Sequence, residues 1–269
     1  DEAYNFYSYA SKKYLWVIQN YPLPNNHIFF TLIQSLMSRD FVYFNPTFIR
    51  IPNLIIGIGS LLGLTLFFKS YFKNFKTFYL LLFIPFCSHT VLAYFLIARG
   101  YLLGSFLSLA SILFLFFSRT KQGRILFSAI FGALAVWTVP TFLYALAGAW
   151  VYLLAIREHR KDVLKSIFIC GLLTIIFYAP VWTQLLEAQK QWGMRLQTFK
   201  FTKDFLYTLG SWGSGNPGNP ISLLGSLVFL ASSMFGLWNT RKLMYKNIIL
   251  ARCLLCSVAM FIFIAEFGS

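Results

Sequence analysis

The stretch RIPNLIIGIGSLLGLTLFFK, residues 50–69, is a long apolar run that begins at Arg50 and ends at Lys69. An α-helix needs about 20 mostly apolar residues to cross a hydrocarbon core roughly 30 Å thick, and apolar runs of about this length recur along the chain between short basic clusters. Within lipid, a helix satisfies all of its own backbone hydrogen bonds. The sequence therefore predicts an all-α protein that crosses a membrane several times.

The composition supports the same class of protein. The chain is 58% hydrophobic and 20% aromatic, with only 12% charged residues, whereas soluble domains carry about 25% charged residues. The net charge of +15 invites comparison with nucleic-acid-binding proteins, but the Lys and Arg residues gather between apolar runs instead of following one face. These charges indicate membrane topology. We expect membrane lipids, and no nucleic acid, among the partners.

The basic clusters predict the topology. Clusters between apolar runs face the cytoplasm, so an even number of crossings must join each cluster to the next. The clusters occupy residues 69–76, 119–124, 157–165 and 241–246. We expect a polytopic bundle of about eight spans, forming one domain over residues 1–269. Its parts are an extracytoplasmic loop at 1–49, six spans within 50–183, an outer loop at 184–220 and two spans within 221–269.

Two segments of the first outer loop have helical character but do not match a span. Ala3, Tyr7, Ala10, Tyr14 and Val17 recur at helical spacing, and NNHIFFTLIQSLMSR at 25–39 forms a second short segment. We expect amphipathic juxtamembrane helices that lie in the membrane interface. Because the chain starts without Met and no anchor precedes Asp1, we also expect it to be a fragment of a longer protein.

The candidate site lies on the expected outer face. The motifs GxxxxGK[ST], HExxH and GxSxG are missing from the sequence, so nucleotide hydrolysis, zinc proteolysis and serine hydrolysis have no local support. A carboxylate can accept a proton from a hydroxyl, and Arg can hold phosphate oxygens by charge-assisted hydrogen bonds. Such residues suit a reaction on a lipid phosphate. The outer-face candidates are Asp1, Glu2, Asn26, His27, Arg50, Arg99 and Tyr101.

Four motifs in order carry a family resemblance. They are DE at 1–2, PNNHIFFTLIQSL at 24–36, RIPNLIIGIGSLLGLTLF at 50–67 and IARGYLLGSFLSLAS at 97–111. In order and spacing, they resemble bacterial members of the multi-spanning GT-C glycosyltransferase superfamily, in particular the protein O-mannosyltransferase-like family 39 and the aminoarabinose transferases. The resemblance covers residues 1–120 in ordered motifs and the rest only in general layout.

The resemblance implies an activity and roles for residues. It implies transfer of a sugar, with inversion, from a polyprenyl-phosphate donor to a lipid, glycan or protein acceptor at the extracytoplasmic face of a bacterial inner membrane. Asp1 matches the family's base and Glu2 its neighbour. The stretch from Asn25 through Asn26 to His27 occupies the place of the family's His-Pro-Pro or Lys-Pro-Pro stretch, although here the prolines come first. Arg99, followed by Tyr101, is the candidate for the donor phosphate.

No cofactor and no obligatory metal are expected. Relatives place a second acidic residue in the turn that holds Arg99, and this chain has none there, so a divalent cation has little support. The pair Cys253 and Cys256 lies in an apolar run without a second pair or a nearby His, which favours packing over metal binding.

Other readings of the sequence stay open. A lipid-linked glycan polymerase or ligase is favoured by the outer loop at 184–220, and a transporter or flippase would share the many spans. Arg50 at a span entrance is also typical of a side chain that reaches to the membrane interface.

Overall fold

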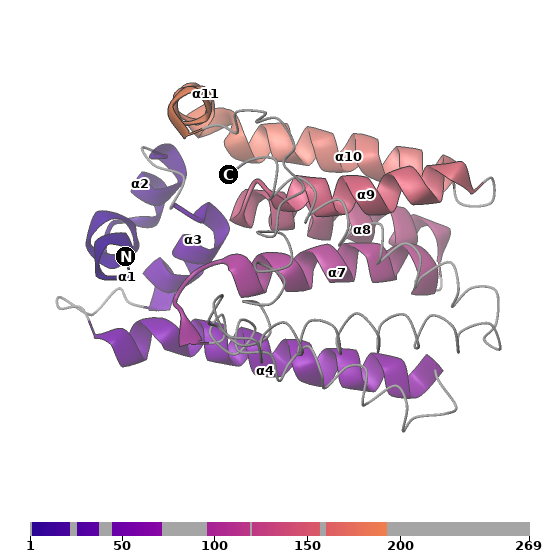
Figure 1. Ribbon diagram of the computed structural model, residues 1–269, viewed down its shortest axis with the longest axis horizontal. Coiled ribbons are helices and arrows are strands. Elements are labelled where there is room, and N and C mark those ends of the chain that lie inside the picture. Colours follow the sequence, from indigo (N-terminus) through magenta and orange to yellow (C-terminus); the bar gives the residue numbers. More distant parts are fainter. Residues whose placement is uncertain are drawn as a thin grey trace, which may run out of the picture.

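The computed structural model describes residues 2–21, 26–37, 45–71, 96–118, 120–156 and 160–192. All regular structure in these ranges is helical, which confirms the predicted all-α class (Figure 1). Short segments lie at one end of a bundle of longer helices. The short segments are α1 (Glu2–Asn5), the π-helical turn η1 (Phe6–Ala10), α2 (Tyr14–Gln19) and α3 (Ile28–Met37). The longer helices are α4 (Pro46–Tyr71), α7 (Tyr101–Phe117), α8 (Lys121–Thr138), α9 (Phe142–Ala155) and α10 (Arg160–Tyr178).

Small residues allow α8 to pack closely between α7 and α10. A Cβ added at Gly132 would lie 3.1 Å from Cys170 Sγ and 3.2 Å from Ser111 Oγ. Beside it, the Ser111 hydroxyl donates to the Ser128 carbonyl oxygen at 2.7 Å, and the Ser166 hydroxyl donates to Ser128 Oγ at 3.0 Å. Small residues and interhelical hydroxyl bonds are typical of helices that associate within a membrane.

The turn between α8 and α9 lies at the proline of the sequence WTVPT, residues 137–141. α8 ends at Thr138 and α9 begins at Phe142, on either side of Pro140. Proline ends a helix because its ring nitrogen has no hydrogen to donate and its ring clashes with the preceding turn. Since the connections between α7, α8, α9 and α10 are short and the helices lie side by side (Figure 1), successive helices run in opposite directions.

The exposed faces of α4 and α10 are apolar. On α10, Phe168 is 73% exposed, and Leu, Ile and Phe side chains are exposed along both helices. An apolar surface of this extent marks contact with a membrane or another protein. Two helical stretches, Pro46–Gly63 and Arg160–Glu187, are long and apolar enough to cross a membrane, whereas α7 and α9 are shorter apolar helices. These features favour a membrane location. The count of eight spans stays a prediction, and the two spans expected within 221–269 lie outside the described residues, as do residues 72–95.

The N-terminal segment differs from the continuous helix expected over residues 3–17. The helix is interrupted after Ala10, where Ser11 N–H donates to Phe6 O and Lys12 N–H donates to Tyr9 O, and Lys13 is extended. The break turns α2 toward α3. α3 itself is packed into the protein, since Ile28, Phe30 and Thr31 are all fully buried. It is therefore less like an interfacial helix than the sequence suggests.

The expected outer loop at 184–220 begins as helix. After α10, the turn η2 (Ala179–Val181) contains Pro180, and α11 (Trp182–Trp192) follows. Gln184 on α11 donates from Nε2 to Gln19 O at 3.0 Å, and its Oε1 accepts from Tyr21 N–H. These bonds hold α11 against the end of α2. The start of the second outer segment therefore lies beside the first.

Candidate functional site

Residues 97–100, called the Arg99 turn below, lead directly into α7. Arg99 N–H donates to Ile97 O at 2.8 Å, and Gly104 N–H donates to Gly100 O at 2.8 Å, the first hydrogen bonds of the turn and the helix. A Cβ at Gly100 would lie 2.7 Å from Thr138 Cγ2 and 2.9 Å from His27 Nδ1. Only glycine fits this close approach between the turn, α8 and the residue before α3.

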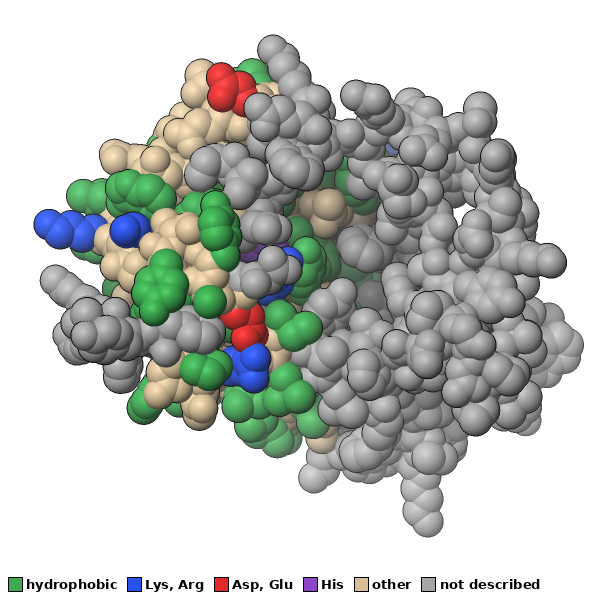
Figure 2. Space-filling model, turned by 60° about the vertical axis from the view of Figure 1, so that its left-hand side comes forward, with side chains coloured by type: hydrophobic (Ala, Val, Ile, Leu, Met, Phe, Trp, Pro, Cys, Tyr) green, Lys and Arg blue, Asp and Glu red, His purple; other side chains and the backbone are tan. Residues whose placement is uncertain are grey.

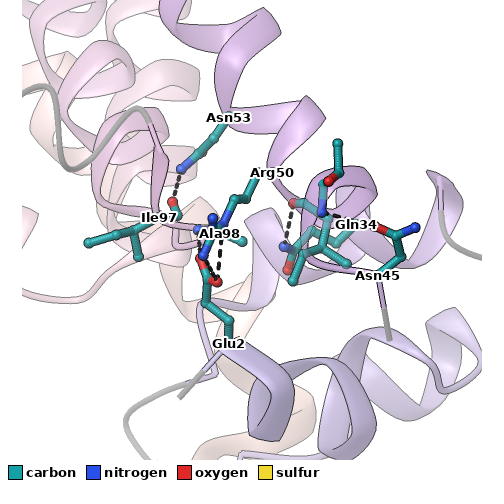
Figure 3. A network of polar contacts seen from close by, with 9 residues as sticks. Glu2, Gln34, Asn45, Arg50, Asn53, Ile97 and Ala98 are labelled. Atoms are coloured by element: carbon teal, nitrogen blue, oxygen red, sulfur yellow. Dashed lines mark hydrogen bonds and ion pairs between the residues drawn. The ribbon is translucent and has the colours of Figure 1, made fainter. Parts of the chain in front are cut away.

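Glu2 joins the Arg99 turn to α4 (Figure 3). Its Oε1 accepts from Ala98 N–H at 2.7 Å, and its carboxylate pairs with Arg50, whose Nη2 lies 2.6 Å from Oε2 and whose Nε lies 3.1 Å from both oxygens. Burial alone raises the pKa of the Glu2 carboxyl, but the bonds from Arg50 and Ala98 outweigh it, and the pKa lies below its usual value. Glu2 is thus a charged anchoring group and a weak base.

Arg50 was predicted to bind substrate, but its guanidinium forms an ion pair with the Glu2 carboxylate. The Arg50 side chain is 42% exposed and the Glu2 side chain 15% exposed, so the pair lies at the edge of the protein. Two nitrogens of the Arg50 guanidinium bond to the two oxygens of the Glu2 carboxylate. This bidentate pair fixes the relative position of α1 and α4. The structure therefore places Glu2 and Arg50 together, as partners of each other.

His27 holds the other side of the Arg99 turn. Its Nδ1 accepts from Gly100 N–H at 2.8 Å, and its ring meets the Tyr101 ring edge to face with centroids 4.7 Å apart. The side chain is buried, and burial, together with the nearby charge of Arg99, lowers the pKa of His27 to about 3. The imidazole is therefore neutral at physiological pH, with its proton on Nε2 because Nδ1 is an acceptor.

Asn26 turns toward the backbone of its own segment. Its Nδ2 donates to Asn20 O at 2.7 Å, and the residue is buried. This bond closes the chain between α2 and α3 and places His27 for its contact with Gly100. In the structure Asn26 thus has an internal partner, although it was predicted to bind substrate.

Asn53 contacts the Arg99 turn but was not predicted from the sequence. Its Nδ2 donates to the carbonyl oxygen of Ile97 (Figure 3). It also donates to the carbonyl oxygen of Arg99 at 3.1 Å, and the residue is fully buried. A signal was present in the sequence, since Asn53 is a polar residue within the apolar run that follows Arg50. Polar residues inside a predicted span are rare and often functional.

The structure brings five of the predicted residues to one place, namely Glu2, His27, Arg50, Arg99 and Tyr101. On the face shown in Figure 2, an acidic group, basic groups and a histidine lie close together. Asp1, the predicted base, lies outside the described residues. In the described part of the chain, no group of three or more His, Cys, Asp or Glu side chains could hold a metal ion.

Comparison of the chain with protein-family models, curated proteins and solved structures found no match.

Proposed function

We propose that the protein is a membrane glycosyltransferase that moves a sugar from a polyprenyl-phosphate-linked donor to a lipid, glycan or protein acceptor at the extracytoplasmic face. The observation that carries this proposal is the Arg99 turn. Side chains from three separate elements hold its backbone: Glu2 on α1, Asn53 on α4 and His27 before α3. Arg99 is therefore a cationic residue on a backbone that is held in place, at one end of an apolar helix bundle. This position suits the binding of a lipid-linked phosphate.

Arg99 would act on the leaving group. In the transfer, the bond from the anomeric carbon to the phosphate oxygen breaks, and a bond to the acceptor oxygen forms on the opposite face of the sugar. Negative charge grows on the departing lipid phosphate. A guanidinium already in place stabilises this charge without reorganisation, and the effect is larger in a site that excludes water.

Asp1 would take the proton of the acceptor hydroxyl. It directly precedes Glu2, whose carboxylate bonds to Ala98 N–H and so ties the start of α1 to the Arg99 turn. Glu2 is assigned an anchoring role in place of the catalytic role expected from the sequence, because its charge is stabilised by Arg50. A base with a lowered pKa accepts protons poorly.

The test uses membranes that contain the full-length protein, polyprenyl-phosphate sugars and candidate acceptors. We expect Asp1→Asn and Arg99→Gln each to lower turnover by roughly 10²-fold or more, the usual cost of losing a base or a charge-stabilising donor. Lys12→Gln, at an exposed basic residue of the same end, should leave turnover unchanged. Equal turnover in wild type and Asp1→Asn would remove the proposed base.

The products separate the alternative functions. Growth of a glycan chain on the lipid donor would indicate a polymerase, and movement of the intact lipid between leaflets without sugar transfer would indicate a flippase. Either result would replace the proposed transferase.

A further inference from the structure

We propose that Asn53 is a positioning residue that sets the orientation of Arg99 through the backbone of the Arg99 turn. The inference rests on the proposed function, because Arg99 is taken to hold the donor phosphate. In this role, a residue of α4 sets the orientation of Arg99. Neither the apolar pattern of the sequence nor the motif resemblance predicts this role.

Asn53 occupies an unfavourable place for its side chain. It is fully buried and lies in a long apolar helix. Burying an amide without hydrogen bonds is costly, and Asn is a poor residue for a helix interior. Part of this cost is offset because Nδ2 donates to the carbonyl oxygens of Ile97 and Arg99. The amide thus bonds to two carbonyl groups of the turn.

The contacts around the Arg99 turn divide by type. Glu2 and His27 accept from the N–H groups of Ala98 and Gly100, whereas Asn53 donates to the carbonyl groups of Ile97 and Arg99. The peptide group between Ile97 and Ala98 is therefore held by Asn53 and Glu2, and the one between Arg99 and Gly100 is held by Asn53 and His27. Between them, Arg99 N–H donates to Ile97 O at 2.8 Å. With the backbone fixed on both sides, the direction of the Arg99 Cα–Cβ bond is fixed as well.

Two residues of α4 act on the turn from one helix face. Arg50 and Asn53 are three residues apart, a spacing that places both on the same side of a helix. Figure 3 shows both side chains reaching from α4 toward residues 97 and 98, Arg50 by way of Glu2 and Asn53 directly. A displacement of α4 would therefore move the Arg99 turn with it.

Loss of the Asn53 amide should release the Arg99 carbonyl and let the peptide between Arg99 and Gly100 rotate. A reacting or binding group displaced by about 1 Å costs roughly 10²-fold in rate. The loss should appear in kcat/KM for the donor, because Arg99 contacts the donor in the proposed reaction. Acceptor binding should not change.

Three variants test the role of Asn53. Asn53→Leu keeps the approximate volume and removes both donors. Asn53→Ser is the milder change, because a serine can bond within its own helix, as Ser60 already does to Ile56 O at 2.6 Å. Ser60→Ala is the matched control, since it removes a buried hydrogen bond of α4 that does not involve the turn.

The first readout is amide hydrogen exchange over residues 96–101 in the detergent-solubilised full-length protein. We expect faster exchange in both Asn53 variants and unchanged exchange in Ser60→Ala. The second readout is transfer activity, where both Asn53 variants should lower kcat/KM for the donor by roughly 10²-fold and leave KM for the acceptor unchanged.

The two proposals fail separately. If wild type transfers no sugar, the proposed function fails while the exchange measurement still decides whether Asn53 holds the turn. Unchanged exchange in Asn53→Leu and Asn53→Ser would overturn the positioning role. A change in KM for the acceptor as large as the change in kcat/KM for the donor would overturn it as well.

Discussion

At the residue scale, the role of a charged or titratable side chain follows from its partner. Glu2 and Arg50 each resemble a catalytic or binding residue in the sequence, yet they bond to each other, and Glu2 also bonds to Ala98. His27 is a neutral acceptor for Gly100 N–H. These three residues build the support on which Arg99 is presented. The proposed chemistry is thereby confined to Arg99 and Asp1.

Acid should weaken this support through His27. Unfolded His27 takes up a proton near its ordinary pKa of 6.5, but in the folded protein its pKa is lowered to about 3 by burial and by Arg99. The unfolded state binds more protons between these values, so stability is complete above the higher one and is lost as the pH falls. The loss is about 2 kcal/mol between pH 6.5 and 5. Thermal unfolding in detergent across this range measures it.

His27→Asn separates the charge effect from the hydrogen bond, because Asn Oδ1 takes the place of Nδ1 and cannot be protonated in this range. We expect the variant to be less stable at pH 7, owing to the lost contact with the Tyr101 ring, but to show a smaller change between pH 6.5 and 5. A wild-type pH dependence that persists in His27→Asn would assign the acid effect to another group.

At the scale of elements, helix packing depends on where the small residues face. Gly132 on α8 lies against Cys170 of α10 and Ser111 of α7, whereas no atom of the described residues lies within 4 Å of a Cβ placed at Gly171. Both glycines lie in helices of similar apolar character. Only the contacts distinguish the glycine needed for packing from the one that faces outward.

Gly132→Leu should therefore destabilise the bundle, by about 1–3 kcal/mol or more, because the added side chain must displace atoms of two neighbouring helices. Gly171→Leu is the matched control and should leave stability unchanged. The thermal midpoint of each variant in detergent, with fluorescence or circular dichroism as the probe, provides the comparison. Equal midpoints would contradict the packing of α8 between α7 and α10.

At the scale of the whole molecule, the two ends of the bundle carry different groups. The Arg99 turn, the Glu2–Arg50 pair and α11 lie at one end, while Lys121 and Arg124 lie 3.6 and 3.9 Å from Asp162 at the other. The second end contains two of the basic clusters that the sequence assigns to the cytoplasm. This arrangement agrees with a candidate site on the opposite, extracytoplasmic side.

Single cysteines test this orientation. In a background without Cys87, Cys170, Cys253 and Cys256, we expect a membrane-impermeant thiol reagent applied to intact cells to label Lys12→Cys. Lys161→Cys should react only after the membrane is opened. Both lysines are exposed in the structure. Labelling of the two positions from the same side would contradict both the topology and the proposed site.

Much of the fold can be predicted from the sequence by itself. The long apolar runs indicate the helices: the run at 50–69 lies within α4, and the motif at 97–111 leads into α7. Pro140 marks the turn between α8 and α9. These features are local, because helix formation and its interruption depend on residues within a few turns. The break at Ser11 and the burial of α3 were not predicted, since both depend on contacts with other elements.

The sequence determined the all-helical class, several helix boundaries and a set of polar residues near one end of the bundle. Only the tertiary structure decided which of them meet: Glu2 with Arg50, 48 residues apart, His27 with Gly100, 73 apart, and Asn53 with Arg99, 46 apart. The physical reason is the separation along the chain over which each kind of interaction acts. Apolar periodicity and proline act on neighbouring residues, but hydrogen bonds between distant side chains and backbone groups exist only once the helices have packed.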